Sequence, residues 1–138
     1  MYLADDLTRN AHSRDGCGNG ISLVDGGSVG RKSGVIVVLV MCANAAEAKK
    51  LAGAAVDQRL AACGNVMGAN AISIYRWKGK VEQAREVLLV LKTTRSRFSA
   101  LEELLRKLHS YELPEIIALA VFAGSAPYLD WVQENVRD

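Results

Sequence analysis

The chain has 138 residues and a formal net charge of +2; half of its residues are apolar and 23% are charged. This length and composition are ordinary for one soluble globular domain with a single core. The small net charge does not favour a nucleic-acid or anionic-membrane partner, and no run of 18 apolar residues predicts a membrane-spanning helix. Three cysteines, Cys17, Cys42 and Cys63, form no CxxC pair, which favours free thiols in a reducing compartment.

Residues 1–33 differ in composition from the rest of the chain. They hold six of the 12 glycines, and their four aspartates balance four basic residues. No apolar segment follows a basic start, so the pattern is not that of a secretory signal, and the aspartates argue against a transit peptide. We therefore predict a disordered N-terminal tail over residues 1–33 and one folded domain over residues 34–138.

The domain begins with strand and helix patterns. The run "GVIVVLVMC" at residues 34–42 is rich in β-branched side chains and predicts a strand buried on both faces. In the following "NAAE", Asn44 as N-cap and Glu47 three residues later form a capping-box pattern. Apolar residues then repeat at helical spacing, and we expect the helix to end near Cys63-Gly64 because glycine is a common helix stop.

The middle of the domain predicts a hairpin, a helix and a strand. Residues 69–94 carry alternating apolar and polar side chains, with Gly79 at the expected hairpin tip. Residues 87–91 are nearly all apolar and are expected to form a central strand. An amphipathic helix is predicted at residues 98–108 and a fourth strand at residues 114–124.

A terminal helix is predicted at residues 125–136, with Ser125 as N-cap and Pro127 in its first turn. With right-handed crossovers, the order β-α-β-β-α-β plus a helix predicts an α+β fold, a ferredoxin-like split βαβ sandwich. Its antiparallel sheet would have the strand order 4-1-3-2 and both helices on one face. The other face would stay uncovered, so we expect the chain to self-associate through the hairpin and the sheet.

Five segments occur together in an order and spacing known from one family. They are "RLAACGN" (59–65), "SIYRWKGK" (73–80), "VLLVLKTT" (87–94), "LHSYELPEIIAL" (108–119) and "GSAPYLDW" (124–131). Together they resemble the CutA family of divalent-cation tolerance proteins, and the resemblance covers about residues 35–137. Five motifs in sequence are far more specific than any one of them.

The resemblance implies a small, cytoplasmic, ferredoxin-like homotrimer that is linked to divalent-cation tolerance, especially of copper. It implies no required cofactor, although copper or another divalent cation is a candidate ligand. The architecture is also similar to that of PII signalling proteins, which bind small ligands in clefts between subunits.

Two residues are candidate metal ligands. His109 is the only histidine of the predicted domain, and a neutral imidazole is a common copper or zinc ligand. By resemblance, the family's metal ligands correspond to positions 108, 109 and 40. Only His109 retains a ligand there, because Leu108 and Val40 cannot bind a metal, and Cys42 lies two residues beyond Val40 at a different position. Cys63 offers a thiolate that suits soft Cu(I). The alternative interpretations are a histidine at the negative end of a helix dipole and a small buried cysteine.

Aromatic residues are concentrated in the motif segments, where five of them occur: Tyr75, Trp77, Tyr111, Tyr128 and Trp131. A Tyr or Trp ring packs well while its polar tip finds a hydrogen-bond partner, so these residues suit a subunit interface. The alternative is that they form the wall of a pocket at the subunit boundary.

Three charged residues accompany these rings. Lys92 ends an apolar strand, which is an unusual place for a lysine, and Glu112 and Glu115 flank Leu113-Pro114. If the three converge, they could hold a small polar ligand or a hydrated cation. Equally, they could form an ion pair that locks the trimer.

No motif in the sequence demands catalysis. GxSxG, HExxH, P-loop and GxGxxG patterns are all absent, so we predict that the protein is not an enzyme. The leading hypothesis is a trimeric, metal-binding or metal-responsive protein of divalent-cation tolerance. The alternatives are a PII-like trimer that binds a small ligand between subunits and a trimer with a purely structural role.

Overall fold

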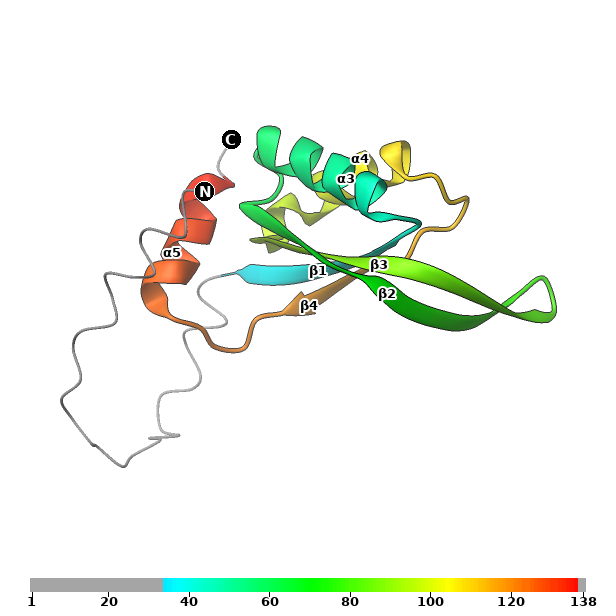
Figure 1. Cartoon of the computed structure of the whole chain (residues 1–138). Helices are drawn as coiled ribbons and strands as arrows, with labels where there is room; N and C mark the ends of the chain where they lie inside the picture. The colour runs from blue at the N-terminus through cyan, green and yellow to red at the C-terminus, as the bar shows by residue number, and fades with distance from the viewer. Residues whose placement is uncertain (1–33, 137–138) are drawn as a thin grey trace, which may run out of the picture.

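The computed structural model describes residues 34–136 (Figure 1). The predicted tail, residues 1–33, lies outside the described residues. The elements are β1 (Val35–Cys42), α3 (Ala45–Asp57), β2 (Cys63–Trp77), β3 (Lys80–Thr94), a 3-10 turn (Arg95–Arg97), α4 (Phe98–Leu108), β4 (Ile116–Ala120) and α5 (Ala126–Asn135).

The four strands form one antiparallel sheet in the order β2-β3-β1-β4. This confirms the predicted order 4-1-3-2 and the ferredoxin-like α+β fold, with the two apolar strands β1 and β3 in the centre. Helices α3 and α4 cover one face of the sheet, and α5 lies at one end of it (Figure 1). Val38 and Leu89 from the strands and Leu51 and Leu101 from the helices are completely buried between these two layers.

Strands β2 and β3 form a long hairpin that extends beyond the rest of the sheet (Figure 1). Trp77 pairs with Lys80 at its tip. Lys78 and Gly79 between them both have positive φ, 50° and 81°, as a two-residue type I′ turn requires. The tip predicted at Gly79 is therefore confirmed.

The first helix ends earlier than its sequence predicts. It stops at Asp57, and Arg59 leaves the helical region with a φ of 56°. The sequence predicts that the helix ends near Cys63, but in the structure Cys63 begins β2. The glycine at position 64 serves packing: a Cβ there would lie 3.0 Å from the Cβ of Ala52 in α3. The close approach of helix and strand explains this glycine better than a helix stop does.

The C-terminal half follows the prediction more closely. Helix α4 has the predicted bounds, and Ser125 caps α5 by accepting a hydrogen bond from the amide of Tyr128. Strand β4 is shorter than predicted because its pairing with β1 ends at Ala120, which lies opposite Ile36. Within residues 34–136, no helix has the length and apolar character needed to cross a bilayer.

Large apolar side chains stay exposed on the hairpin and near β4. They are Ile72, Ile74, Val81, Ile117, Leu119 and Phe122. On β4, Ile116 packs against the core, so its neighbour Ile117 points to the face away from the helices. In a single chain, Ile117 and Leu119 of β4 therefore stay uncovered on this face, while Ile72, Ile74 and Val81 stay exposed on the projecting hairpin.

Candidate metal centre

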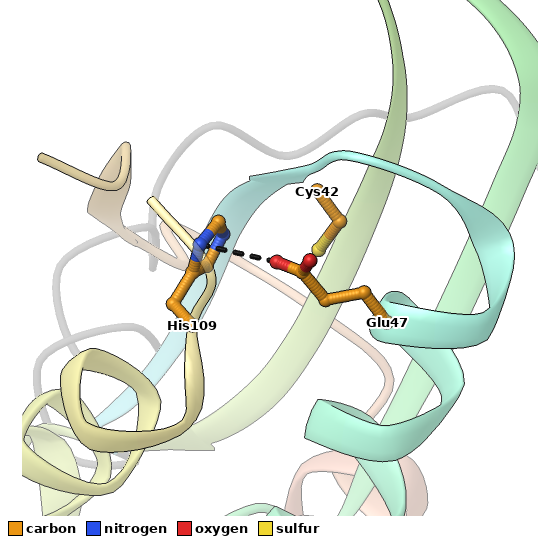
Figure 2. Close-up of side chains that lie close together, drawn as sticks. All are labelled: Cys42, Glu47 and His109. Carbon is orange, nitrogen blue, oxygen red and sulfur yellow. Dashed lines mark ion pairs between the residues drawn. The ribbon is translucent and has the colours of Figure 1, made fainter. Parts of the chain in front are cut away.

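Three side chains with metal-binding chemistry meet where β1, α3 and α4 come together. Cys42 ends β1, Glu47 lies in the first turn of α3, and His109 follows the last residue of α4. One potential ligand atom from each lies within 4.8 Å of the other two. Figure 2 shows the three side chains pointing toward one another from these separate elements.

The N-cap of α3 and a hydrogen bond from Ser110 position Glu47 in this cluster. Asn44 caps α3, its Oδ1 accepting a hydrogen bond of 2.8 Å from the amide of Glu47, so the helix begins directly after β1. The carboxylate of Glu47 is thereby held near the positive end of the helix dipole. The side chain turns toward α4, where Ser110 Oγ donates a hydrogen bond of 2.6 Å to Oε2.

The hydrogen bonds of His109 define its tautomer. Nε2 lies 2.8 Å from the carbonyl oxygen of Met41, which can only accept, so Nε2 carries a proton. The amide of Tyr111 can only donate, and it lies 3.0 Å from Nδ1. Nδ1 is therefore the accepting nitrogen of a neutral imidazole, the form in which histidine binds metals.

One carboxylate oxygen of Glu47 has no hydrogen-bond donor in this arrangement. Oε1 lies 3.1 Å from Nδ1 of His109, the pair joined by a dashed line in Figure 2. Because neutral Nδ1 has no proton to donate, Oε1 stays buried without a hydrogen-bond partner. Such a group costs about 1–3 kcal/mol. A cation bound between the nitrogen, the oxygen and the nearby sulfur would satisfy this oxygen, although it would compete with the Tyr111 amide for the lone pair of Nδ1.

Cys42 contributes a protonated thiol to the cluster. Its side chain is completely buried. Burial, followed by the negative charges of Glu47 and Glu86, raises the pKa of this thiol to about 12. A metal ion must therefore displace the thiol proton in order to bind the sulfur. The positive charge of the metal would help, because it lowers the pKa that burial, Glu47 and Glu86 raise.

The other predicted ligand, Cys63, lies outside this cluster. It is half-buried at the start of β2, and its Sγ is 3.4 Å from the hydroxyl of Tyr128. Burial and the contact with Cys63 raise the pKa of Tyr128 to about 12. The Tyr128 ring stacks on Trp131 with centroids 5.6 Å apart.

Lys92 belongs to the same neighbourhood as Cys63. The two residues lie opposite each other in the β2–β3 pair, and Lys92 Nζ donates to Oδ1 of Asn65. Within one chain, Lys92 therefore has Asn65 as its partner rather than Glu112 or Glu115.

The remaining predicted residues gather around one pocket. It has a volume of about 710 Å³ and lies between the β2–β3 hairpin and the segment before β4. The predicted residues that line it are Tyr75, Trp77, Tyr111, Glu112 and Glu115. The structure thus divides the predicted interface residues into a pocket group and a group around Cys63.

Sequence reasoning did not select Cys42 and Glu47 as ligands, although a signal for each was present. Cys42 has the same strand parity as Val38 and Val40, which places it on the helix-covered face. Glu47 was interpreted only as a capping residue. Neither pattern shows that α4 brings His109 to the same point.

The chain is similar to CutA proteins both in sequence and in structure. The family described as CutA1 divalent ion tolerance protein matches residues 36–135. The divalent-cation tolerance protein CutA of Thermus thermophilus is 44% identical over 99 residues, which cover 72% of this chain and 95% of that protein. The human protein CutA is 44% identical over 117 residues, which cover 83% of this chain and 65% of that protein.

Solved structures agree with this match. The Thermus thermophilus structure has a TM-score of 0.72 at 43% identity and covers 75% of this chain and 99% of that one. CutA1 from Oryza sativa has a TM-score of 0.72 at 39% identity, with 75% and 94% covered. The chain spans about two thirds or less of the mammalian relatives, 65% of the human and 56% of the mouse protein. On these matches, the chain belongs to the CutA1 family of divalent ion tolerance proteins.

Proposed function

We propose that this protein acts in divalent-cation tolerance by binding copper or a chemically similar ion in the Cys42–Glu47–His109 cluster. The observation that carries the proposal is the buried, unpartnered Oε1 of Glu47, which faces an imidazole nitrogen beside a thiol. Buried carboxylate oxygens are normally satisfied, so an unsatisfied one among ligand atoms suggests a bound cation.

The donor set favours particular metals. Sulfur and imidazole nitrogen suit Cu(I), Cu(II) and Zn(II), whereas Mg²⁺ and Ca²⁺ prefer oxygen ligands only. The burial of Cys42 and His109 restricts access of water to the ion. The ligands come from three separate elements, so binding would also tie β1, α3 and α4 together.

The proposal includes a homotrimer in the cytoplasm without enzymatic activity. The exposed apolar side chains of the hairpin and β4 support self-association, and the resemblance to CutA proteins suggests three copies. The family's name describes tolerance and not a reaction. The widely spaced cysteines suit a reducing compartment.

The aromatic and acidic lining of the pocket favours a second function, the binding of a small molecule by the same protein. This function would place the chain closer to PII-like binding proteins. It requires no metal.

Calorimetric titration of the full chain with Zn(II), and with Cu(I) in the absence of oxygen, tests the metal proposal. We expect one ion per chain in wild-type protein and affinity at least tenfold lower in Cys42→Ser and in Glu47→Gln. Cys63→Ser is the matched control and should bind as wild type does. Unchanged affinity in Cys42→Ser would contradict the proposal, and loss of binding in Cys63→Ser alone would move the site to Cys63.

A further inference from the structure

The pocket beside the hairpin carries a chemical pattern that the metal cluster does not use. Three of its lining residues are aromatic, Tyr75, Trp77 and Tyr111, and three are acidic, Glu86, Glu112 and Glu115. Its volume of about 710 Å³ lies in the range of small-molecule sites.

Glu86 is the most informative of these residues. It is only 8% exposed, yet within residues 34–136 it forms no ion pair. Among the described residues, its one side-chain hydrogen bond comes from the neutral hydroxyl of Tyr111, which donates to Oε2 at 2.9 Å. A carboxylate this deeply buried is normally paired with a positive charge, so its position in the pocket wall points to a cation supplied by a ligand.

The basic residue that lines the pocket does not fill that role. Within the described part of the chain, Arg76 is the one basic residue of the lining, and its Nη1 donates to the carbonyl of Gly79 at the hairpin turn. Three carboxylates against this one guanidinium leave the lining with a formal charge of −2. The wall therefore favours cations over anions or neutral molecules.

The aromatic rings distinguish an organic cation from a metal ion. The faces of Trp and Tyr rings attract ammonium groups, whereas a hydrated divalent metal prefers oxygen ligands. Trp77 already has one such partner, because Lys78 Nζ lies 5.7 Å from its ring centroid. Apolar groups of a ligand would meet Leu113, which also lines the pocket.

We propose that this pocket binds a small organic cation, an alkylammonium ion whose charge is balanced by Glu86 and whose ammonium group lies against the aromatic rings. This site is separate from the metal cluster and does not depend on it. The two are neighbours, since the backbone amide of Tyr111 donates to His109 while its hydroxyl donates to Glu86.

The test uses n-butylammonium as a probe, with n-butanol and butyrate as its neutral and anionic counterparts. Binding to the full chain is followed by NMR through the indole N–H resonance of Trp77. We expect saturable binding of butylammonium, with butanol and butyrate at least tenfold weaker. Equal binding of butanol, or no binding of butylammonium at millimolar concentration, would overturn the proposal.

Variants assign the effect to residues. Glu86→Gln should weaken butylammonium binding at least tenfold, while Glu103→Gln, an equal loss of charge on the exposed surface of α4, should change it less than twofold. Should Glu86→Gln fail to fold, Trp77→Leu replaces it, followed through ligand-observed NMR. It keeps apolar bulk at an exposed position and should weaken binding at least threefold. Wild-type affinity in both of these variants, or in the only one that folds, would refute the assignment.

Discussion

Nδ1 of His109 lies 3.1 Å from Oε1 of Glu47, and the amide of Tyr111 already donates to that nitrogen. The carboxylate oxygen therefore faces a lone pair instead of a proton. With a neutral imidazole this contact gives the metal-free protein no hydrogen bond, whereas a cation between the two atoms is stabilised by both. A metal bound at Nδ1 would compete with the Tyr111 amide, so metal binding should shift the turn that follows α4.

Replacing Glu47 by Gln should stabilise the metal-free protein. The amide oxygen can still accept from Ser110, and the amide nitrogen can share the Nδ1 lone pair of His109 with the Tyr111 amide. Removing the unpartnered oxygen should raise the free energy of unfolding by about 1 kcal/mol. Urea denaturation in the presence of a chelator measures this change. A clear loss of stability would mean that Oε1 has a favourable partner in solution.

Stability should fall at alkaline pH because of Cys42. Its pKa is about 12 in the folded protein and 9.0 for an ordinary thiol. Between these values the unfolded chain releases the thiol proton while the folded chain keeps it. The stabilisation is thus complete below pH 9 and is lost as the pH rises toward 12.

Denaturation at a series of pH values from 8 to 11 checks this effect. Cys42→Ala should lose stability less steeply than wild type above pH 9, by up to about 1.4 kcal/mol per pH unit. Tyr128, whose pKa is also raised to about 12, keeps some decline in both proteins. Val40→Ala removes buried bulk from the same strand without removing a titratable group, so it is the control and should retain the wild-type slope. Equal slopes in wild type and Cys42→Ala would contradict the burial of this thiol.

Gly64→Ala should destabilise the fold by about 1–3 kcal/mol, the range for overpacked cores. The new Cβ would lie 2.9 Å from Leu91 Cδ2 and 3.0 Å from Ala52 Cβ, so α3 must move away from the sheet. Gly53→Ala is the matched control, because that exposed glycine of α3 has no atom within 4 Å of an added Cβ. It should stabilise the protein by about 0.4–1 kcal/mol. Similar thermal midpoints for the two variants would argue against the close helix–strand approach.

Ile74→Lys should disrupt self-association without unfolding the chain. Ile74 is 69% exposed on the hairpin, where a lysine is tolerated in a monomer but not in an apolar interface. Light scattering should give a trimer mass for wild type and a smaller mass for the variant, with unchanged far-UV circular dichroism. Lys80→Ala, at the hairpin tip, serves as a control. A wild-type mass in Ile74→Lys would show that the subunits meet elsewhere.

Periodicity predicted most of the fold. The apolar runs of β1 and β3, the bounds of α4, the Gly79 tip and the Ser125 cap depend on local chemistry, and local chemistry is present in the sequence. The end of α3 was predicted wrongly because Gly64 resembles a helix stop. The actual reason for a glycine at position 64 is the close approach of Ala52, which is a contact between two elements.

The candidate site was less predictable for the same reason. His109 was selected by residue type and by resemblance to the CutA family, whereas its partners depend on how β1, α3 and α4 meet. Glu112 and Glu115 do share a pocket, but Lys92 lies opposite Cys63 in another part of the sheet. Pairings across separate elements require the tertiary structure.

X-ray absorption at the zinc edge tests the central claim most directly. The variant Cys17→Ser/Cys63→Ser keeps Cys42 as the only cysteine of the chain. Loaded with one Zn(II) per chain, it should show one sulfur neighbour at about 2.3 Å together with nitrogen and oxygen neighbours near 2.0–2.2 Å. A first shell without sulfur would exclude Cys42 as a ligand and contradict the proposed metal centre.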